Sequence, residues 1–269
     1  MKVISVKYSD DMSAFARHYH DAHQILYVLS GDILLSVGSE EYRVRSGSLV
    51  ILSRLEEHAI RVLSSEYKRF TLRISGDTEA KPGELYLLSS VLTNRSAGFS
   101  HVVGTGEKRG IFERLFFEMC GEYQKKEALY SEKLDTLLTE LLIELYRYSP
   151  EHFVSEVNRQ TLLVQAIQRR LEGDCSERHT LSSIASEYHI SEFYLSHIFK
   201  DITGYSPIDY LMSCRLSAAK KLLSTTDKPI KEIVYSCGFS DESNFSRIFR
   251  QRVGITPTDF RKKFGSEGR

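Results

Sequence analysis

The sequence predicts an α+β protein of two domains, in which an antiparallel β-barrel with following helices precedes an all-α domain with two helix-turn-helix units. Three observations predict this order. Short apolar runs separated by Gly and Ser turns fill residues 1 to about 75. Apolar residues recur at helical spacing from about residue 107. One residue pattern then occurs twice between Thr180 and Phe264, which indicates two copies of one supersecondary unit.

The N-terminal region contains five short apolar segments with the length and composition of β-strands. Gly31, Gly38 and Gly47 lie in the turns between them. No helical pattern separates these segments, so consecutive strands can pair directly, which favours an antiparallel barrel or sandwich. The predicted strands are residues 25–29, 33–37, 42–45, 48–52 and 70–74.

Two helical patterns follow the strands. One face of the first is formed by Phe112, Leu115, Phe116 and Met119. The second is expected over residues 131–148, with Ser131 as its N-cap. Its leucines at 134, 138, 141 and 145 have the four-three-four spacing of a short coiled-coil seam. This face either pairs with a second copy of the chain or packs on the protein's own barrel, and the two interpretations have equal weight.

Residues 149–159 interrupt the helical pattern at Ser149-Pro150 and form the predicted linker. The predicted domains are therefore residues 1–148 and 160–269. A helix over 161–171 is expected to open the second domain. A longer helix over 206–224 can join the two repeated units rigidly, at about 1.5 Å per residue.

The duplicated pattern indicates two short helices and a tight turn in each copy. In its later part, each residue of the first copy has its counterpart fifty positions on, as Phe199 has Phe249. Ser191 can cap the second helix of the first copy, and Gly204 and Gly254 suit left-handed C-caps. Each second helix has one apolar stripe and an opposite polar, basic face, which is the helix-turn-helix arrangement. A helical interaction module that never touches DNA would show the same periodicity.

Long motifs within this stretch carry a specific resemblance. They are Ser191-x-x-Tyr194-Leu195-Ser196-x-Ile198-Phe199-Lys200, Gly204-x-Ser206-Pro207, Arg215-Leu216-x-x-Ala219, Gly238-Phe239-Ser240-Asp241, Phe245-Ser246-x-Ile248-Phe249-Arg250 and Gly254-Ile255-Thr256-Pro257. The stretch resembles the DNA-binding domain of the AraC/XylS family of bacterial transcription regulators. Val234 stands where this family usually has Ala, and Asn244 stands where an aromatic residue is common.

The resemblance implies a cytoplasmic regulator that binds double-stranded DNA sequence-specifically, dimerises through the 131–148 helix and could contact RNA polymerase. Arg247 is the foremost expected base reader, because Arg pairs bidentately with guanine. Lesser candidates are Phe193, Ser196, His197, Glu242, Ser243 and Ser246. Lys200, Arg250, Lys262 and Lys263 are the expected phosphate contacts.

A second resemblance involves His18-x-His20-x-x-x-Gln24, Val28-Leu29-Ser30-Gly31, Gly47-x-Leu49-x-x-Leu52 and Glu57-His58. These residues are similar to the cupin barrel that many members of the family carry. By two-residue alternation His18, His20 and Gln24 would share one side of a strand, and His58 could join them. We expect these four residues to line the pocket of a small-molecule effector.

Sugar sensing is common among cupin-bearing relatives, although nothing in this sequence selects a sugar. Metal-binding cupins have Glu where Gln24 stands, and neutral Gln is a weaker ligand for a divalent cation. No metal or other cofactor is therefore predicted. Ordinary barrel histidines are the remaining alternative.

Several other classes find no support. No apolar run reaches about eighteen residues and no signal region begins the chain, which indicates a soluble, non-secreted protein. The four scattered cysteines suit a reducing compartment. Arg109 stands where a dinucleotide fingerprint needs its third Gly, and no nucleophile elbow or Walker motif occurs, so no enzyme is predicted. Two rival hypotheses remain: a cupin metalloenzyme fused to a helical domain, and an architectural DNA-binding protein.

Overall fold

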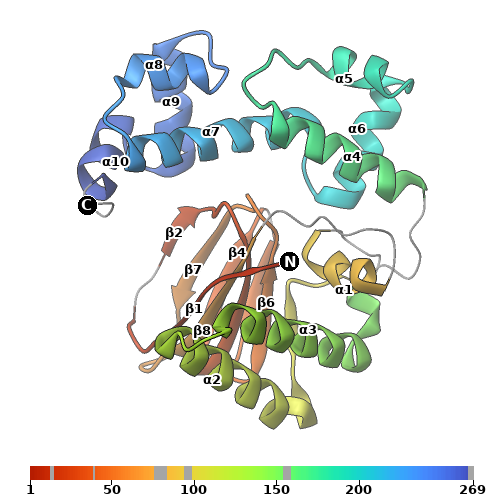
Figure 1. Ribbon diagram of the computed structural model, residues 1–269, viewed down its shortest axis with the longest axis vertical. Coiled ribbons are helices and arrows are strands. Elements are labelled where there is room, and N and C mark those ends of the chain that lie inside the picture. Colours follow the sequence, from red (N-terminus) through yellow and green to blue (C-terminus); the bar gives the residue numbers. More distant parts are fainter. Residues whose placement is uncertain (13–14, 39, 76–83, 94–98, 154–158, 266–269) are drawn as a thin grey trace. The chain divides into compact units, whose positions relative to one another are not determined.

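The computed structural model describes the chain except residues 13–14, 39, 76–83, 94–98, 154–158 and 266–269. The chain divides into two compact units, Met1–Val157 and Asn158–Arg269 (Figure 1). The first unit combines antiparallel sheets with helices, and the described part of the second is helical. The predicted α+β architecture of two domains is therefore confirmed.

Two antiparallel sheets form the centre of the first unit. The larger has the order β1 (Val3–Ser9), β8 (Lys68–Ile74), β3 (His23–Ser30), β6 (Ser48–Leu52) and β9 (Val102–Gly104). The smaller has the order β2 (Phe15–His18), β7 (His58–Val62), β4 (Ile33–Val37) and β5 (Glu40–Val44). The five predicted strands are present as β3, β4, β5, β6 and β8. Strands β1, β2, β7 and β9 were not predicted.

Alternation along the strands divides the apolar residues of the first unit into two clusters. Leu26, Val28 and Val50 of the larger sheet pack with Ile33, Leu35 and Ile60 of the smaller sheet. The opposite face of the larger sheet packs on the helices α1 (Glu84–Thr93), α2 (Arg109–Lys125) and α3 (Tyr130–Tyr148). Figure 1 shows α2 and α3 lying across that sheet. Helix α1 was not predicted.

The leucine stripe of α3 faces this core. Leu134, Leu138, Leu141 and Leu145 are at most 1% exposed and belong to the cluster between the helices and the larger sheet. The interpretation of this stripe as a dimer seam is therefore wrong, because a single protomer already buries it. The predicted Ser131 cap is also wrong, since α3 begins one residue earlier and Leu129 occupies the cap position without a side-chain hydrogen bond.

The first residues of the predicted linker are folded onto the first unit. A short 3₁₀ helix, η2, spans Pro150–His152, and Phe153 is 3% exposed with its ring against Tyr146. Helix α4 begins at Arg159. The remaining residues, 154–158, lie outside the described part of the chain.

The second unit contains α4 (Arg159–Gly173), α5 (Leu181–Glu187), α6 (Glu192–Thr203), α7 (Pro207–Thr225), α8 (Ile230–Ser236), α9 (Glu242–Val253) and α10 (Pro257–Phe264). The predicted Ser191 cap is present, and Ser206 and Thr256 cap α7 and α10 in the same way: each of the three accepts a backbone N–H from the first turn of its helix. Gly204 and Gly254 end α6 and α9 with φ of 80° and 85°. Helix α7 packs against α4 and α6 toward one of its ends and against α8 and α10 toward the other (Figure 1).

Two further expectations concern chemistry and location. All four cysteines are free thiols, and Cys120, Cys214 and Cys237 are buried. Among the described helices, none has the length and apolar character needed to cross a membrane.

Candidate functional site

The outer face of α6 presents an aromatic pair to solvent. Phe193 is 74% exposed, and its ring centroid lies 4.3 Å from that of His197. The Nδ1–H of His197 donates to the carbonyl oxygen of Phe193 at 3.2 Å. This bond fixes the tautomer, so Nε2 of His197 remains an outward acceptor. Lys200 is exposed and Ser196 is half-buried on the same helix.

The outer face of α9 is more basic. Ser243, Ser246, Arg247 and Arg250 are exposed, whereas Glu242 is half-buried. The guanidinium of Arg247 donates through Nη2 to Oδ1 of Asn244 at 2.9 Å. This bond orients the guanidinium along the outer face of the helix. Asn244, which was not a sequence candidate, therefore orients the side chain of the foremost expected base reader.

The N-terminus of α9 is also fixed. The carboxylate of Asp241 accepts the backbone N–H groups of Ser243 and Asn244. This cap satisfies two of the donors that a helix start leaves free. At the other end, Arg252 forms an ion pair with Asp209 at the start of α7, with 3.0 Å between Nη2 and Oδ1. Helix α9 is thereby linked to α7, the helix that follows α6.

The loop between α4 and α5 contacts both α7 and the turn between α8 and α9. Nε and Nη2 of Arg215 on α7 donate to the carbonyl oxygens of Cys175 and Glu177, both at 2.7 Å. Gly238, in the turn between α8 and α9, has φ of 81°, and a Cβ there would lie 2.6 Å from the carbonyl oxygen of Ser176. Only glycine fits this close approach.

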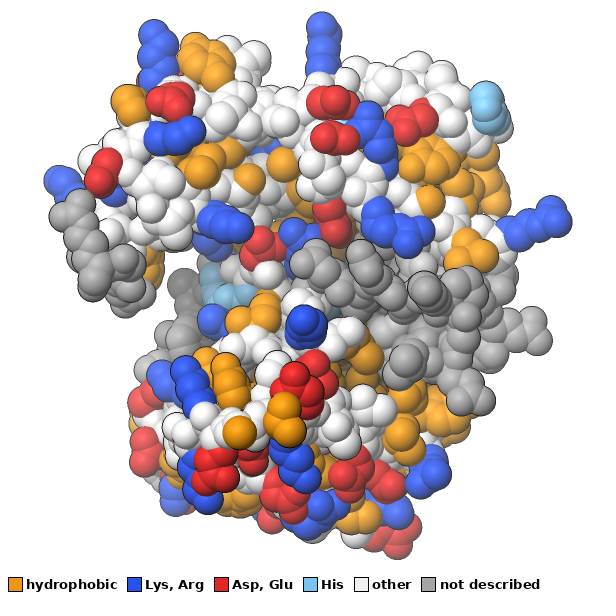
Figure 2. Space-filling model, in the orientation of Figure 1, with side chains coloured by type: hydrophobic (Ala, Val, Ile, Leu, Met, Phe, Trp, Pro, Cys, Tyr) orange, Lys and Arg blue, Asp and Glu red, His pale blue; other side chains and the backbone are white. Residues whose placement is uncertain are grey.

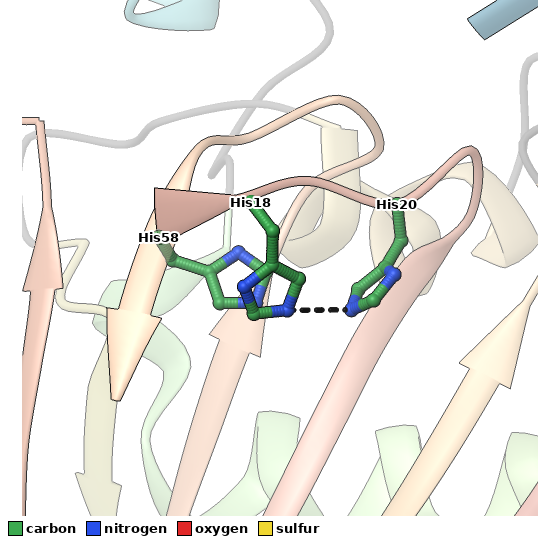
Figure 3. Close-up of side chains that lie close together, drawn as sticks. All are labelled: His18, His20 and His58. Carbon is green, nitrogen blue, oxygen red and sulfur yellow. Dashed lines mark hydrogen bonds between the residues drawn. The ribbon is translucent and has the colours of Figure 1, made fainter. Parts of the chain in front are cut away.

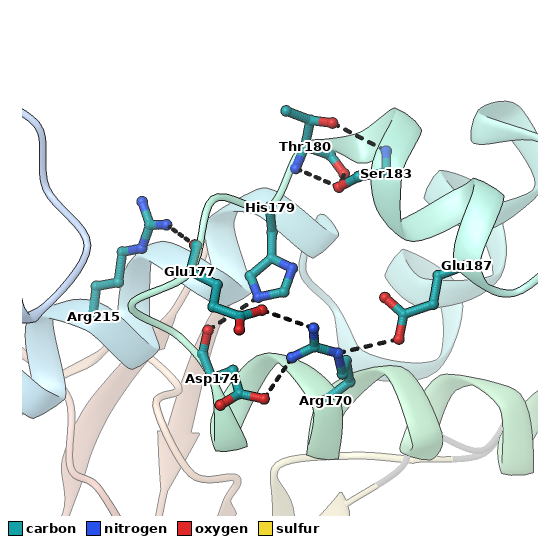
Figure 4. Close-up of polar contacts among 8 residues, drawn as sticks. All are labelled: Arg170, Asp174, Glu177, His179, Thr180, Ser183, Glu187 and Arg215. Atoms are coloured by element: carbon teal, nitrogen blue, oxygen red, sulfur yellow. Dashed lines mark hydrogen bonds and ion pairs between the residues drawn. The ribbon is translucent and has the colours of Figure 1, made fainter.

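Figure 4 shows the polar network below this loop. Arg170 of α4 contacts the carboxylates of Asp174, Glu177 and Glu187 at 2.6, 2.8 and 3.1 Å. The hydrogen bond and charge of Arg170 hold the pKa of Glu177 below its usual value. Thr180 and Ser183 form a reciprocal capping box at the start of α5. These contacts fix α4 to the first helix-turn-helix and leave Arg170 unavailable to phosphate.

The remaining basic candidates are exposed. Lys262 and Lys263 lie in the last turn of α10 with their side chains in solvent. Acidic and basic side chains are interspersed on the visible face of each unit in Figure 2. The candidate basic residues for nucleic-acid contact are the exposed ones of α6, α9 and α10.

The first unit contains the other candidate residues, of which Gln24 and His58 are buried and His18 and His20 are half-buried. The expectation that His18, His20 and Gln24 share one strand is wrong. His18 ends β2, His20 lies in the following turn, and Gln24 lies in β3. Antiparallel pairing of β2 with β7 places His18 opposite His58. Three imidazoles therefore meet by strand pairing and a turn.

Figure 3 shows the histidine cluster, formed by His18, His20 and His58. The Nε2 atoms of His18 and His20 are 3.2 Å apart. The ring centroids of His18 and His58 are 4.4 Å apart. His58 is 2% exposed, and burial, with the neighbouring His18 adding to it, lowers its pKa to about 4. Its imidazole is therefore neutral at physiological pH.

Two further polar groups point between the sheets near this cluster. Gln24 precedes the inward-facing Leu26 by two residues and is 4% exposed, and its Oε1 has no hydrogen-bond partner among the described residues. Arg73, opposite Gln24 in the β3–β8 pairing, reaches Nδ1 of His20 with its Nη2 at 3.4 Å. Burial lowers the pKa of Arg73, and no described carboxylate forms an ion pair with it. A guanidinium with no acidic partner among the described residues thus lies beside the imidazoles.

Arg73 was not among the sequence candidates. The sequence pattern that could have identified it lies in β8, where polar and apolar residues alternate. The polar residues are Arg69, Thr71 and Arg73, and the apolar ones are Phe70, Leu72 and Ile74. In a strand whose apolar side packs on helices, such alternation places arginines on the face toward the second sheet. The pattern becomes informative only when helices are known to cover the opposite face.

Comparisons with protein families match both units. Residues 4–142, more than half of the chain, match the model of the AraC-like ligand binding domain. Residues 184–263 match a helix-turn-helix domain.

Two curated relatives are transcriptional activators. The HTH-type transcriptional activator RhaR of Yersinia pseudotuberculosis serotype O:3 is 24% identical over 263 residues, covering 93% of this chain and 86% of that protein. RhaR of Enterobacter sp. strain 638 is 23% identical over 258 residues, covering 93% and 88%.

Two solved structures share the fold over nearly the whole chain. ToxT from Vibrio cholerae strain SCE256, bound to an unsaturated fatty acid, has a TM-score of 0.64 at 17% identity and covers 96% of this chain and 95% of its own. ToxT from Vibrio cholerae O395 has a TM-score of 0.61 at 16% identity, with coverage of 97% and 98%. At these identities the likeness concerns the fold alone.

Proposed function

Since the chain belongs to the AraC family of transcription regulators, we propose that it reads DNA with α6 and α9 and responds to an effector held at the histidine cluster. The family has a ligand-binding domain and a helix-turn-helix DNA-binding domain, so this chain is an effector-regulated DNA-binding regulator.

The observation that carries the DNA proposal is the pair of capped, outward-facing recognition helices within one unit. Helix α7 separates them, and the Arg252–Asp209 ion pair fixes the start of α7 to the end of α9. Two recognition helices held in this way suit successive major grooves on one side of the duplex, about 34 Å apart. Side chains on both outer faces would then reach base edges simultaneously.

The two helices carry different chemistry and should recognise different base features. Arg247 offers two parallel donors, which match O6 and N7 of guanine. On α6, Phe193 offers an apolar contact for a thymine methyl, and Nε2 of His197 offers an acceptor for a base amino group. Ser196, Ser243, Ser246 and Glu242 are supplementary contacts. Lys200, Arg250, Lys262 and Lys263 are assigned to phosphates.

The effector proposal is supported by unsatisfied polar groups in the interior of the first unit. Gln24 Oε1 and His58 Nε2 are buried without hydrogen-bond partners among the described residues, and Arg73 lacks an acidic partner there. Buried polar groups are normally satisfied, so their concentration at one place suits a polar ligand. A sugar is one candidate. Such a ligand acts by favouring one state of the regulator over another.

A cytoplasmic homodimer is also proposed, and it must use a surface other than the α3 stripe. Phe117 on α2 is 54% exposed, and Leu129 before α3 is 73% exposed. An apolar contact between copies could include both. RNA polymerase is a further proposed partner, which suits the role of the RhaR relatives as activators. We also propose a regulatory, non-catalytic role, which is usual for this family.

The test begins with the full chain and a random duplex library, from which preferred sites are selected. The affinity for a preferred and a scrambled duplex is then measured with and without a panel of monosaccharides. We expect preference for the selected duplex and a change of affinity with one effector. His58→Ala should abolish the effector response while the affinity without effector is retained. Equal affinity for all duplexes would contradict the proposal.

A further inference from the structure

The histidine cluster has the geometry of a metal site. One ring nitrogen from each of His18, His20 and His58 can be chosen so that all three lie within 4.8 Å of one another. The Nε2 atoms of His18 and His20 are already 3.2 Å apart. Two ligands of a tetrahedral ion bound at 2.0–2.1 Å are separated by about 3.3 Å. Small rotations of the imidazoles would therefore bring all three into the first coordination shell.

His58 is held in the tautomer that a ligand needs. Its Nδ1–H donates to the carbonyl oxygen of Glu56 at 2.9 Å. The lone pair therefore lies on Nε2, which is buried and has no partner among the described residues. Histidines that bind metals commonly donate their other ring N–H to a carbonyl or carboxylate in this way. The bond orients the ring and leaves its free nitrogen toward His18.

We propose that His18, His20 and His58 bind one divalent transition-metal ion of the Zn²⁺ class and leave one coordination position open. Three imidazoles are a complete protein ligand set for such a site, so Gln24 is not required as a ligand. The neutral Gln24, which disfavours a metal when the sequence is considered alone, is then compatible with one. The inference deepens the effector proposal and rests on it for the role of the open position.

The open position suits an anionic oxygen, a carboxylate foremost. An ion bound to three neutral imidazoles keeps its full positive charge, and Arg73 adds another without an acidic partner in the described chain. When His20 binds a metal through Nε2, its proton lies on Nδ1. That nitrogen can then no longer accept a hydrogen bond from Arg73. The guanidinium is then free to pair with the same anion.

The first experiment measures metal binding by the untagged full chain. Bound metal is quantified after equilibration with Zn²⁺ and dialysis, and affinity is measured by competition with a chromophoric chelator. Co²⁺ absorption reports the coordination geometry. We expect one ion per chain with a tetrahedral Co²⁺ spectrum. Absence of stoichiometric binding overturns the proposal.

Variants localise the site. His18→Ala and His58→Ala should each weaken metal binding by at least about 10–100-fold. Even substitutions of residues that only hydrogen-bond to a metal ligand cause a loss of that size. His18→Cys keeps a donor and should restore binding with a thiolate charge-transfer band. His179→Ala removes an exposed imidazole of the other unit and should have no effect. Unchanged affinity in both alanine variants overturns the proposal, and His18→Ala remains informative if His58→Ala fails to fold.

The ligand class and the regulatory role are tested separately. Acetate should change the Co²⁺ spectrum of the wild type and much less that of Arg73→Gln, whereas no change in the wild type overturns the anionic assignment. A chain that binds no metal but whose DNA affinity responds to an effector would overturn this inference and leave the proposed function intact. A chain that binds metal but shows no DNA preference would overturn the proposed function and leave the metal site intact.

Discussion

The two units place their candidate functional residues in opposite environments. In the first unit, Gln24 and His58 are at most 4% exposed and lie within the folded core. In the second, Phe193 is 74% exposed, and Arg247 stands on an open helix face. A buried polar group costs stability unless a partner satisfies it, whereas an exposed side chain is solvated already. Changes at the first site should therefore affect folding, and changes at the second should affect binding alone.

The largest expected effect concerns the buried leucines of the first unit. Leu138→Asp with Leu141→Asp places two carboxylates in the core between α3 and the larger sheet, and should cost at least about 4 kcal/mol. Circular dichroism and thermal unfolding of the full chain measure this loss. Lys133→Asp, an exposed change on the same helix, is the control and should leave the melting temperature nearly unchanged. A folded, monomeric double variant would restore the dimer-seam interpretation.

Acid should destabilise the first unit at a higher pH than the second. The pKa of His58 is lowered from 6.5 to about 4 in the folded protein, so the unfolded chain binds the proton more tightly. Stability is then fully present above pH 6.5 and declines as the pH falls from 6.5 to about 4, by about 3 kcal/mol in metal-free protein. Glu177, whose pKa is lowered from its ordinary value of 4.5, also contributes stability that is lost in acid, but only as the pH falls below 4.5.

The measurement is chemical denaturation of chelator-treated protein at several pH values, with hydrogen exchange to assign the unit that opens. The first unit should open at the higher pH. His58→Gln should flatten the dependence between pH 6.5 and 4. The same slope in wild type and variant would exclude His58 as its source.

On the exposed side, Arg247→Ala should cost about 1–3 kcal/mol on the preferred duplex and relax the preference at one base pair. Asn244→Ala should reproduce part of this loss, because the guanidinium loses the hydrogen bond that orients it. Titrations against preferred and scrambled duplexes measure both. Neither variant should alter the melting temperature appreciably. An equal loss on both duplexes would make Arg247 a phosphate contact.

The smallest effects belong to the phosphate candidates. Lys200→Ala, Arg250→Ala or Lys262→Ala should weaken binding about equally on all sequences and reduce the salt slope by about one unit. Titrations at two salt concentrations suffice to measure it. Arg170→Ala provides the contrast, since its guanidinium is engaged by three carboxylates. It should leave the salt slope unchanged.

The comparison also explains what the sequence could predict. The helix-turn-helix units were predictable because their caps, glycines and apolar stripes are local signals, as at Ser191 and Gly204. The histidine cluster depends on β2 pairing with β7, which places His18 opposite His58 across forty residues of chain. Strands β2 and β7 are four and five residues long, too short to reveal that pairing by alternation.

The leucines of α3 show a second limit. A stripe at four-three-four spacing is equally suitable for a second copy of the helix and for a sheet of the same chain, since both offer an apolar surface. Which partner the stripe takes depends on the face of the larger sheet that points away from the smaller sheet. Ile25, Tyr27, Phe70 and Leu72 form that face. That face exists only once β3 and β8 have paired. The sequence pattern therefore could not decide it.

Protection of DNA by the full chain tests the central claim most directly. Guanine N7 methylation interference and backbone cleavage are measured on a selected duplex, with wild type, Arg247→Ala and Phe193→Ala. The account predicts two protected major-groove segments on one side of the helix, about 34 Å apart, with Arg247→Ala weakening one and Phe193→Ala the other. A single protected segment for each bound DNA-binding unit, or loss of the same segment in both variants, would contradict it.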